Sequence, residues 1–187
     1  MGTRISLWIT VLLFFFPLIG HSQWKISPEF LQVLQQVDAE VMPPLDAGYK
    51  VRYPVSNRTQ NYQWVLRSRK ERLEIRYLVS PFTASNPTLK YPAIAAHRLA
   101  MHVCSNEEEA MISARDLDEE ELQDFYNADW GKIYIFPPKD DFSTYAYCQL
   151  VVLFKVDRGI VYLFHLFDEP SPAIDQRLYS FRFKENQ

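Results

Sequence analysis

Several segments of the chain alternate apolar and polar residues with a period of two, which is typical of half-buried strands. The first half contains three such segments, over residues 48–53, 60–68 and 71–79. The last third contains three more, over residues 132–136, 143–156 and 159–167. Two polar turns, Arg69-Lys70 and Asp157-Arg158-Gly159, separate neighbouring segments. Strands joined by turns this short pair antiparallel, so we expect two hairpins in an antiparallel sheet.

Apolar residues spaced three and four apart predict helices around these strands. Ser27-Pro28-Glu29 opens the first helix, because serine caps a helix and proline and glutamate suit its first turn. We expect this helix to span residues 28–42 and to end before Pro43-Pro44. Further helices are expected over residues 93–104, over residues 119–127 after a capping pair of Asp118 and Glu121, and from Pro172 onward.

The order of helix, three strands, helices, three strands and helix keeps strands and helices apart along the chain. It predicts an α+β fold, an antiparallel sheet of about six strands flanked by helices. The sequence has 187 residues and no internal repeat. Residues 23–187 therefore suit a single domain.

The first 22 residues have the layout of a secretory signal peptide. Arg4 precedes an apolar run from Leu7 to Ile19, and the small residues Gly20 and Ser22 stand at −3 and −1 of a cut before Gln23. The run is shorter than the ~20 residues of a membrane-spanning helix, so cleavage is favoured over an uncleaved anchor. We expect an exported protein, periplasmic or extracellular, without a membrane span after cleavage.

Composition narrows the class of partner. The formal charge is −3, and it becomes −4 after cleavage because Arg4 is the segment's only charged residue. A mildly acidic protein lacks the basic footprint that nucleic acid requires. The 48% hydrophobic and 23% charged residues are ordinary for a globular protein.

Cysteines and histidines offer weak signals for chemistry. Cys104 and Cys148 are able to pair in an oxidising compartment, and two buried reduced thiols are the alternative. His97 and His102 are five residues apart and point away from each other on a helix, so they do not form a metal pair. His165 lies in an apolar strand, as a core histidine would. We expect no metal, no cofactor and no catalytic residue.

Charged residues provide the candidate binding surface. Four arginines on the two strands before and after the first turn would form a ladder on one sheet face: Arg67, Arg69, Arg72 and Arg76. Guanidinium forks suit carboxylates and phosphates. The alternative is internal neutralisation by Glu71, Glu74 and the acidic run over residues 107–129. That run lacks the glycine turn of a calcium loop and is typical of a solvated surface.

Three segments together resemble the Mog1/PsbP/DcrB-like group of small exported or accessory α/β proteins: Gly48-Tyr-Lys-Val-Arg-Tyr-Pro54, the hairpin strands around Gly159, and Tyr179-Ser-Phe-Arg-Phe183. The resemblance implies an antiparallel sheet flanked by helices that is used for binding rather than catalysis. The block over residues 62–77 is more cationic than this group would have.

These features predict an exported, non-catalytic binding or accessory protein with a protein or anionic ligand of the cell envelope as its partner. Two other classes remain open. A hydrolase would need polar groups that converge in one cleft with shifted pKa values. A carrier of an apolar ligand would need a large empty cavity inside the sheet.

Overall fold

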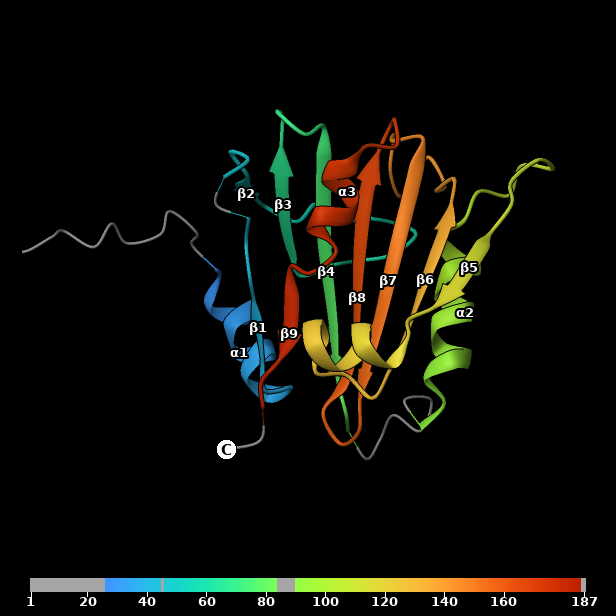
Figure 1. Cartoon of the computed structure of the whole chain (residues 1–187). Coiled ribbons are helices and arrows are strands. Elements are labelled where there is room, and N and C mark those ends of the chain that lie inside the picture. The colour runs from blue at the N-terminus through green and yellow to red at the C-terminus, as the bar shows by residue number, and fades with distance from the viewer. Residues whose placement is uncertain (1–25, 45, 84–89, 186–187) are drawn as a thin grey trace, which may run out of the picture.

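The computed structural model describes residues 26–44, 46–83 and 90–185, so the expected signal peptide over residues 1–22 lies outside the described residues. Its main sheet has the order β2-β3-β4-β8-β7-β6-β5, and every neighbouring pair is antiparallel (Figure 1). The strands of this sheet are β2 (Lys50–Arg52), β3 (Trp64–Ser68), β4 (Leu73–Pro81), β5 (Ser113–Asp116), β6 (Trp130–Phe136), β7 (Tyr147–Lys155) and β8 (Gly159–Phe167). The predicted antiparallel α+β class is confirmed, with seven strands in this sheet.

Both predicted hairpins are present. β3 and β4 pair through a turn in which Arg72 has a φ of +52°. β7 and β8 pair through the turn at Asp157, Arg158 and Gly159, where Asp157 has a φ of +59°. The left-handed region is accessible to aspartate, which explains how a turn with one glycine closes this hairpin.

The first helix is shorter than predicted. α1 spans Pro28–Gln36 and begins with Ser27 as its cap, whose hydroxyl accepts a hydrogen bond from Phe30 N. The chain then reverses at Asp38 (φ +46°) and forms β1 (Ala39–Val41), which pairs with β9 (Phe181–Phe183). The prediction of helix to residue 42 is wrong because pairing with the C-terminal strand outweighs local helical spacing.

The other helices match their predicted positions more closely. α2 spans Pro92–Val103 and α3 spans Pro172–Arg177. The segment predicted as a helix over 119–127 winds as a π-helix over Glu121–Tyr126, labelled η2. The expected capping pair forms, since Asp118 Oδ1 accepts from Glu121 N and Glu121 Oε2 accepts from Asp118 N.

Two apolar cores fill the two faces of the main sheet. On one face, α1, α3, η2 and the β1–β9 pair cover residues such as Trp64 and Tyr77. On the other face, α2 covers residues such as Phe136 and Leu150 (Figure 1). Among the described helices, α2 is the one that packs on the second face, where loop residues such as Tyr62 and Phe142 complete the core, and this arrangement shapes the candidate site.

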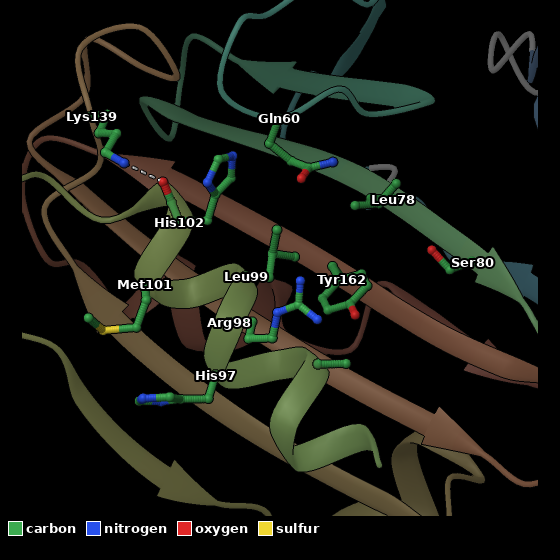
Figure 2. Close-up of a pocket in the computed structure, with 11 residues that line it drawn as sticks. Gln60, Leu78, Ser80, His97, Arg98, Leu99, Met101, His102, Lys139 and Tyr162 are labelled. Carbon is green, nitrogen blue, oxygen red and sulfur yellow. Dashed lines mark hydrogen bonds between the residues drawn. The ribbon is translucent and has the colours of Figure 1, made fainter. Parts of the chain in front are cut away.

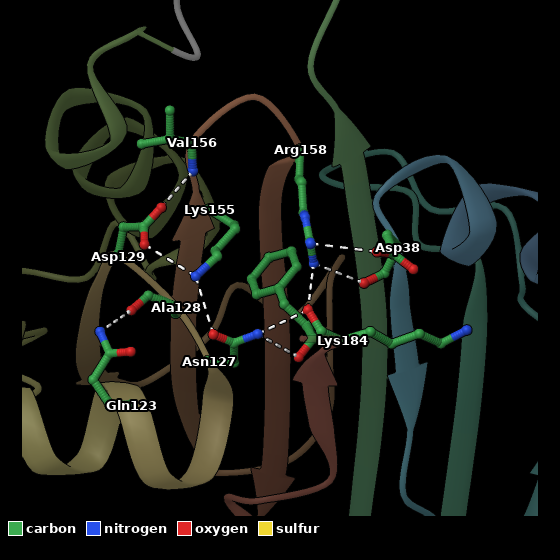
Figure 3. A network of polar contacts seen from close by, with 10 residues as sticks. Asp38, Gln123, Asn127, Ala128, Asp129, Lys155, Val156, Arg158 and Lys184 are labelled. Carbon is green, nitrogen blue, oxygen red and sulfur yellow. Dashed lines mark hydrogen bonds and ion pairs between the residues drawn. The ribbon is translucent and has the colours of Figure 1, made fainter. Parts of the chain in front are cut away.

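A polar network fixes the end of the β7–β8 hairpin (Figure 3). Arg158 donates to the carbonyl oxygens of Asp38 and Lys184 and forms an ion pair with the Asp38 carboxylate at 3.3 Å. Lys155 donates to Asn127 and Asp129, both at 3.1 Å. Helix η2, the β9 end and the turn after α1 are thus joined to one hairpin.

Within residues 26–44, 46–83 and 90–185, none of the helices has the length and apolar character required to cross a membrane.

Candidate functional site

The second face of the sheet is wider than the helix that covers it. Seven strands at ~4.8 Å spacing span about 29 Å, whereas a helix with its side chains is about 10–12 Å across. α2 packs on β6 and β7. Its Ala96 and Ala100 are fully buried, and such small side chains hold it close to the sheet. On this face of the sheet, β4 and β8 therefore lie beside α2 and are not covered by it.

A groove of about 800 Å³ runs between α2 and these two strands (Figure 2). Its apolar surface comes from Leu78 of β4, Tyr162 of β8, and Ala95 and Leu99 of α2. The remaining lining residues are Gln60, Ser80, His97, Arg98, Met101, His102 and Lys139. A volume of several hundred Å³ with an apolar lining and a few polar groups is typical of a small-molecule site.

Among the described residues, the polar lining includes Arg98 and Lys139 and no carboxylate. Arg98 and His102 point from α2 toward the space beside β4, and Lys139 lies at the end near His102 (Figure 2). His102 Nε2 lies 2.7 Å from the Thr59 carbonyl oxygen, which fastens the loop before β3 to the helix. Lys139 Nζ donates to the His102 carbonyl oxygen at 2.7 Å. This contact places a positive charge at the negative end of the α2 dipole.

Arg98 is the cation with the greatest freedom to meet a ligand. It is exposed and forms no ion pair with any carboxylate in the part of the chain that the structure describes. Burial raises the pKa of Tyr162 to about 12, while the positive charge of Arg98 opposes this rise. Tyr162 is therefore a neutral phenol at physiological pH, and the groove keeps its positive charge.

Comparisons with known proteins add no relative: no family model, no curated protein and no solved structure matches this chain.

Arg76 of the predicted ladder is a structural residue. Its side chain is 10% exposed, and its Nε donates to Glu74 at 2.8 Å. The guanidinium lies between the rings of Tyr62 and Phe142, at 4.6 and 4.8 Å from their centroids, and donates to the Phe142 carbonyl oxygen. Tyr62 precedes β3, which begins at Trp64, and it packs against the core on the opposite face of the sheet from Trp64.

The other three ladder arginines are exposed and form a looser group. Arg67, Arg69 and Arg72 line a small hollow of about 160 Å³ beside Tyr145. Arg67 Nε is 4.0 Å from Glu74, and Arg72 lies 3.7 Å from Glu169. The neutralisation alternative holds for Glu74, which pairs with Arg76 and lies near Arg67, but among the described ion pairs it does not hold for the acidic run or for Glu71. Glu121 of that run binds Arg115 at 2.8 Å, and Glu71 binds Arg177 at 2.6 Å.

Both cysteines are buried free thiols, so the disulfide between Cys104 and Cys148 is not formed in this structure. Burial raises the pKa of each thiol, which makes both poor nucleophiles. His165 is fully buried with Nε2 at 3.1 Å from the Arg177 carbonyl oxygen. His102 and His165 are thus held on backbone carbonyls, not on a hydroxyl or thiol. Within the described ranges, no three acidic, histidine or cysteine side chains gather as metal ligands.

Sequence reasoning missed the groove. The segment of α2 was expected only as a helix over residues 93–104, and Arg98 was not considered. A signal was present: Arg98 is the single formal charge among the twelve residues of Pro92–Val103. A helix that is fully solvated on its outer face carries more polar residues than this. In α2, by contrast, the exposed side includes apolar side chains: Ile94 and Met101 are each 55% exposed.

Proposed function

We propose that this chain is an exported, non-catalytic binding protein, and that the groove beside α2 binds an organic anion with an apolar body. The observation that carries the proposal is the groove lining, which combines apolar side chains with Arg98, His102 and Lys139 and lacks a carboxylate. A site of one charge sign raises the local concentration of ligands of the opposite sign.

The dimensions of the groove suit a short amphiphile. From Ala95 to His102 the wall of α2 is about 10 Å long, at ~1.5 Å rise per residue. Leu78, Leu99 and Tyr162 would contact the apolar part of the ligand. Arg98 would hold its carboxylate or phosphate by a forked pair of hydrogen bonds.

Binding is favoured over hydrolysis by the state of the polar groups. The groove's His102 is engaged with a backbone carbonyl, and its Tyr162 has a raised pKa. A general base needs a nucleophile within hydrogen-bond reach, and the hydrogen bond of His102 goes to a backbone carbonyl oxygen rather than to a hydroxyl or thiol. A purely apolar ligand in an enclosed cavity is not favoured either, because the two cores fill the sheet faces and the groove is open.

Export remains part of the proposal, as does membership of the Mog1/PsbP/DcrB-like group. The intact mass of the protein from its native host tests export. We expect a chain that begins at Gln23. A chain that retains Met1 in the membrane fraction would contradict cleavage.

Calorimetric titration with decanoate tests the groove. We expect saturable binding of decanoate and weaker binding of decanol, because decanol lacks the charge that Arg98 recognises. Arg98→Gln should weaken decanoate binding about tenfold, since a hydrogen bond to a charged group is worth about 1.5 kcal/mol or more. Decanol binding should change little.

A second variant tests the place of binding. Ser80→Trp, on the β4 wall, should fill the groove and abolish binding of both compounds. Ser113→Trp on the exposed strand β5 is the matched control and should bind as the wild type does. Equal affinity in wild type, Arg98→Gln and Ser80→Trp would exclude the groove as the binding site.

A further inference from the structure

A second surface, separate from the groove, lies on strands β2 and β3. Lys50 of β2 and Arg67 of β3 are directly opposite each other in the antiparallel register. Opposite residues of an antiparallel pair point to the same face of the sheet. Arg52 lies two residues along β2 and shares this face. We name Lys50, Arg52 and Arg67 the cation strip.

The strip places like charges side by side. Opposite like charges destabilise a strand pair, and an acid next to them would relieve the repulsion. Glu74 is opposite Arg67 on the other side of β3. However, Glu74 makes its short contact, 2.8 Å, with Arg76 and is 4.0 Å from Arg67. One carboxylate is therefore shared by two guanidinium groups.

The strip is also open to solvent. Lys50 and Arg52 are exposed and form no ion pair with a carboxylate of the described chain. The Arg67 side chain is 50% exposed. Helix α2 packs at β6 and β7, several strands away (Figure 1). The uncompensated charge thus faces water.

The edge of the sheet adds a second means of binding. β2 is the terminal strand of the main sheet and pairs with β3 on one side, while its other side pairs with no described strand. Such an edge has backbone N–H and C=O groups available to a further strand. Tyr53 and Val55, which follow β2, are 95% and 70% exposed and offer apolar contacts.

We propose that an extended acidic segment of a partner protein adds to β2 and neutralises the cation strip. Side chains two residues apart in a strand are about 6.6–6.8 Å apart and share a face. Acidic residues at alternate positions of the segment would therefore lie beside Lys50 and Arg52. An anionic membrane would use the charge but not the backbone edge of β2, so a polypeptide is the better match.

Fluorescence anisotropy with a labelled eight-residue peptide of alternating glutamate and threonine tests this proposal. The same peptide with glutamine in place of glutamate is the control. We expect the glutamate peptide to bind more tightly, with an affinity that falls as NaCl screens the exposed charges. Equal binding of both peptides would overturn the proposal.

Variants separate this surface from the groove. The double variant Lys50→Gln/Arg52→Gln should bind the glutamate peptide about tenfold more weakly, as expected for the loss of two exposed ion pairs. Lys50→Gln alone should leave the melting temperature unchanged or raise it, because it removes the charge opposite Arg67. Arg98→Gln in the groove should leave peptide binding unchanged. Loss of peptide binding in Arg98→Gln alone would overturn the proposal.

Two measurements exclude other occupants. The first is binding to phosphatidylglycerol vesicles. If the wild type binds these vesicles but not the peptide, and Lys50→Gln/Arg52→Gln abolishes vesicle binding, the strip binds a membrane surface. A dimer in sedimentation that the same double variant dissociates would assign the strip to a second copy of this chain. Either result contradicts the acidic-segment proposal and leaves the decanoate test of the groove unaffected.

Discussion

The fully buried His165 should make the protein sensitive to mild acid. Burial lowers the pKa of its imidazole from 6.5 to about 4, although the hydrogen bond with the Arg177 backbone opposes the shift. The unfolded chain therefore takes up a proton near pH 6.5, while the folded chain does so only near pH 4. Stability from this group is present above pH 6.5 and is lost as the pH falls to about 4.

The size of the loss follows from the shift. A difference of one pKa unit corresponds to about 1.4 kcal/mol, so a change from 6.5 to about 4 corresponds to about 3 kcal/mol. His165→Gln keeps a donor for the Arg177 carbonyl oxygen and removes the titration. At pH 7 the variant should have a free energy of unfolding about 1 kcal/mol below that of the wild type. Between pH 7 and pH 4 its free energy of unfolding should then fall by about 3 kcal/mol less than that of the wild type.

Urea unfolding at half-unit steps from pH 7 to pH 4 measures this difference, because carboxylates titrate alike in both proteins and cancel. His97→Gln replaces an exposed histidine of α2 and is the matched control for the same change of side chain at the surface. If His165→Gln loses stability as steeply as the wild type, the buried imidazole is not responsible for the acid sensitivity.

Two further predictions concern the stability of glycine variants and the reactivity of the two thiols. Gly159→Ala should cost about 3 kcal/mol, because its Cβ would lie 2.4 Å from the Ser80 carbonyl oxygen at a φ of +148°. Gly48 has a φ of +64° but open space around its Cβ position, so Gly48→Ala should lower the free energy of unfolding by only about 1 kcal/mol. If urea unfolding shows equal losses for the two variants, the contact with Ser80 is not the cause. Cys104 and Cys148 should react slowly with dithiobis(nitrobenzoate) in the folded protein and fast in urea. Fast labelling of Cys104 in the folded protein would instead indicate an accessible thiolate.

Six strands of the main sheet were predictable because each has an alternating pattern that matches a face of the sheet, whereas β1, β5 and β9, of three or four residues each, were not predicted. β8 has the predicted bounds, Gly159–Phe167, since both of its ends are fixed by local signals: a glycine turn and a proline-rich break. The end of α1 was not predictable in this way. Val41 fits the apolar stripe of a helix, and it fits a strand position opposite Phe181 equally well. Only pairing with β9, which is distant in the sequence, decides between the two structures.

The candidate sites depend still more on distant contacts. Sequence alternation placed Arg67 and Arg76 on one face, and the structure agrees. Their exposure could not be read from the pattern, because Arg76 is buried by Tyr62 and by Phe142, which is 66 residues away in the chain. Likewise, the groove exists because α2 packs on β6 and β7 rather than on β4.

Two-dimensional NMR of the methyl groups during a titration with decanoate tests the groove most directly. We expect the methyl resonances of Leu78 and Leu99, which line the groove, to shift in a saturable way with a common affinity. The methyl resonances of Leu150, which is fully buried beneath the same sheet face, should stay in place. Shifts that do not saturate, or that leave Leu78 and Leu99 unaffected, would contradict an anion-binding groove beside α2.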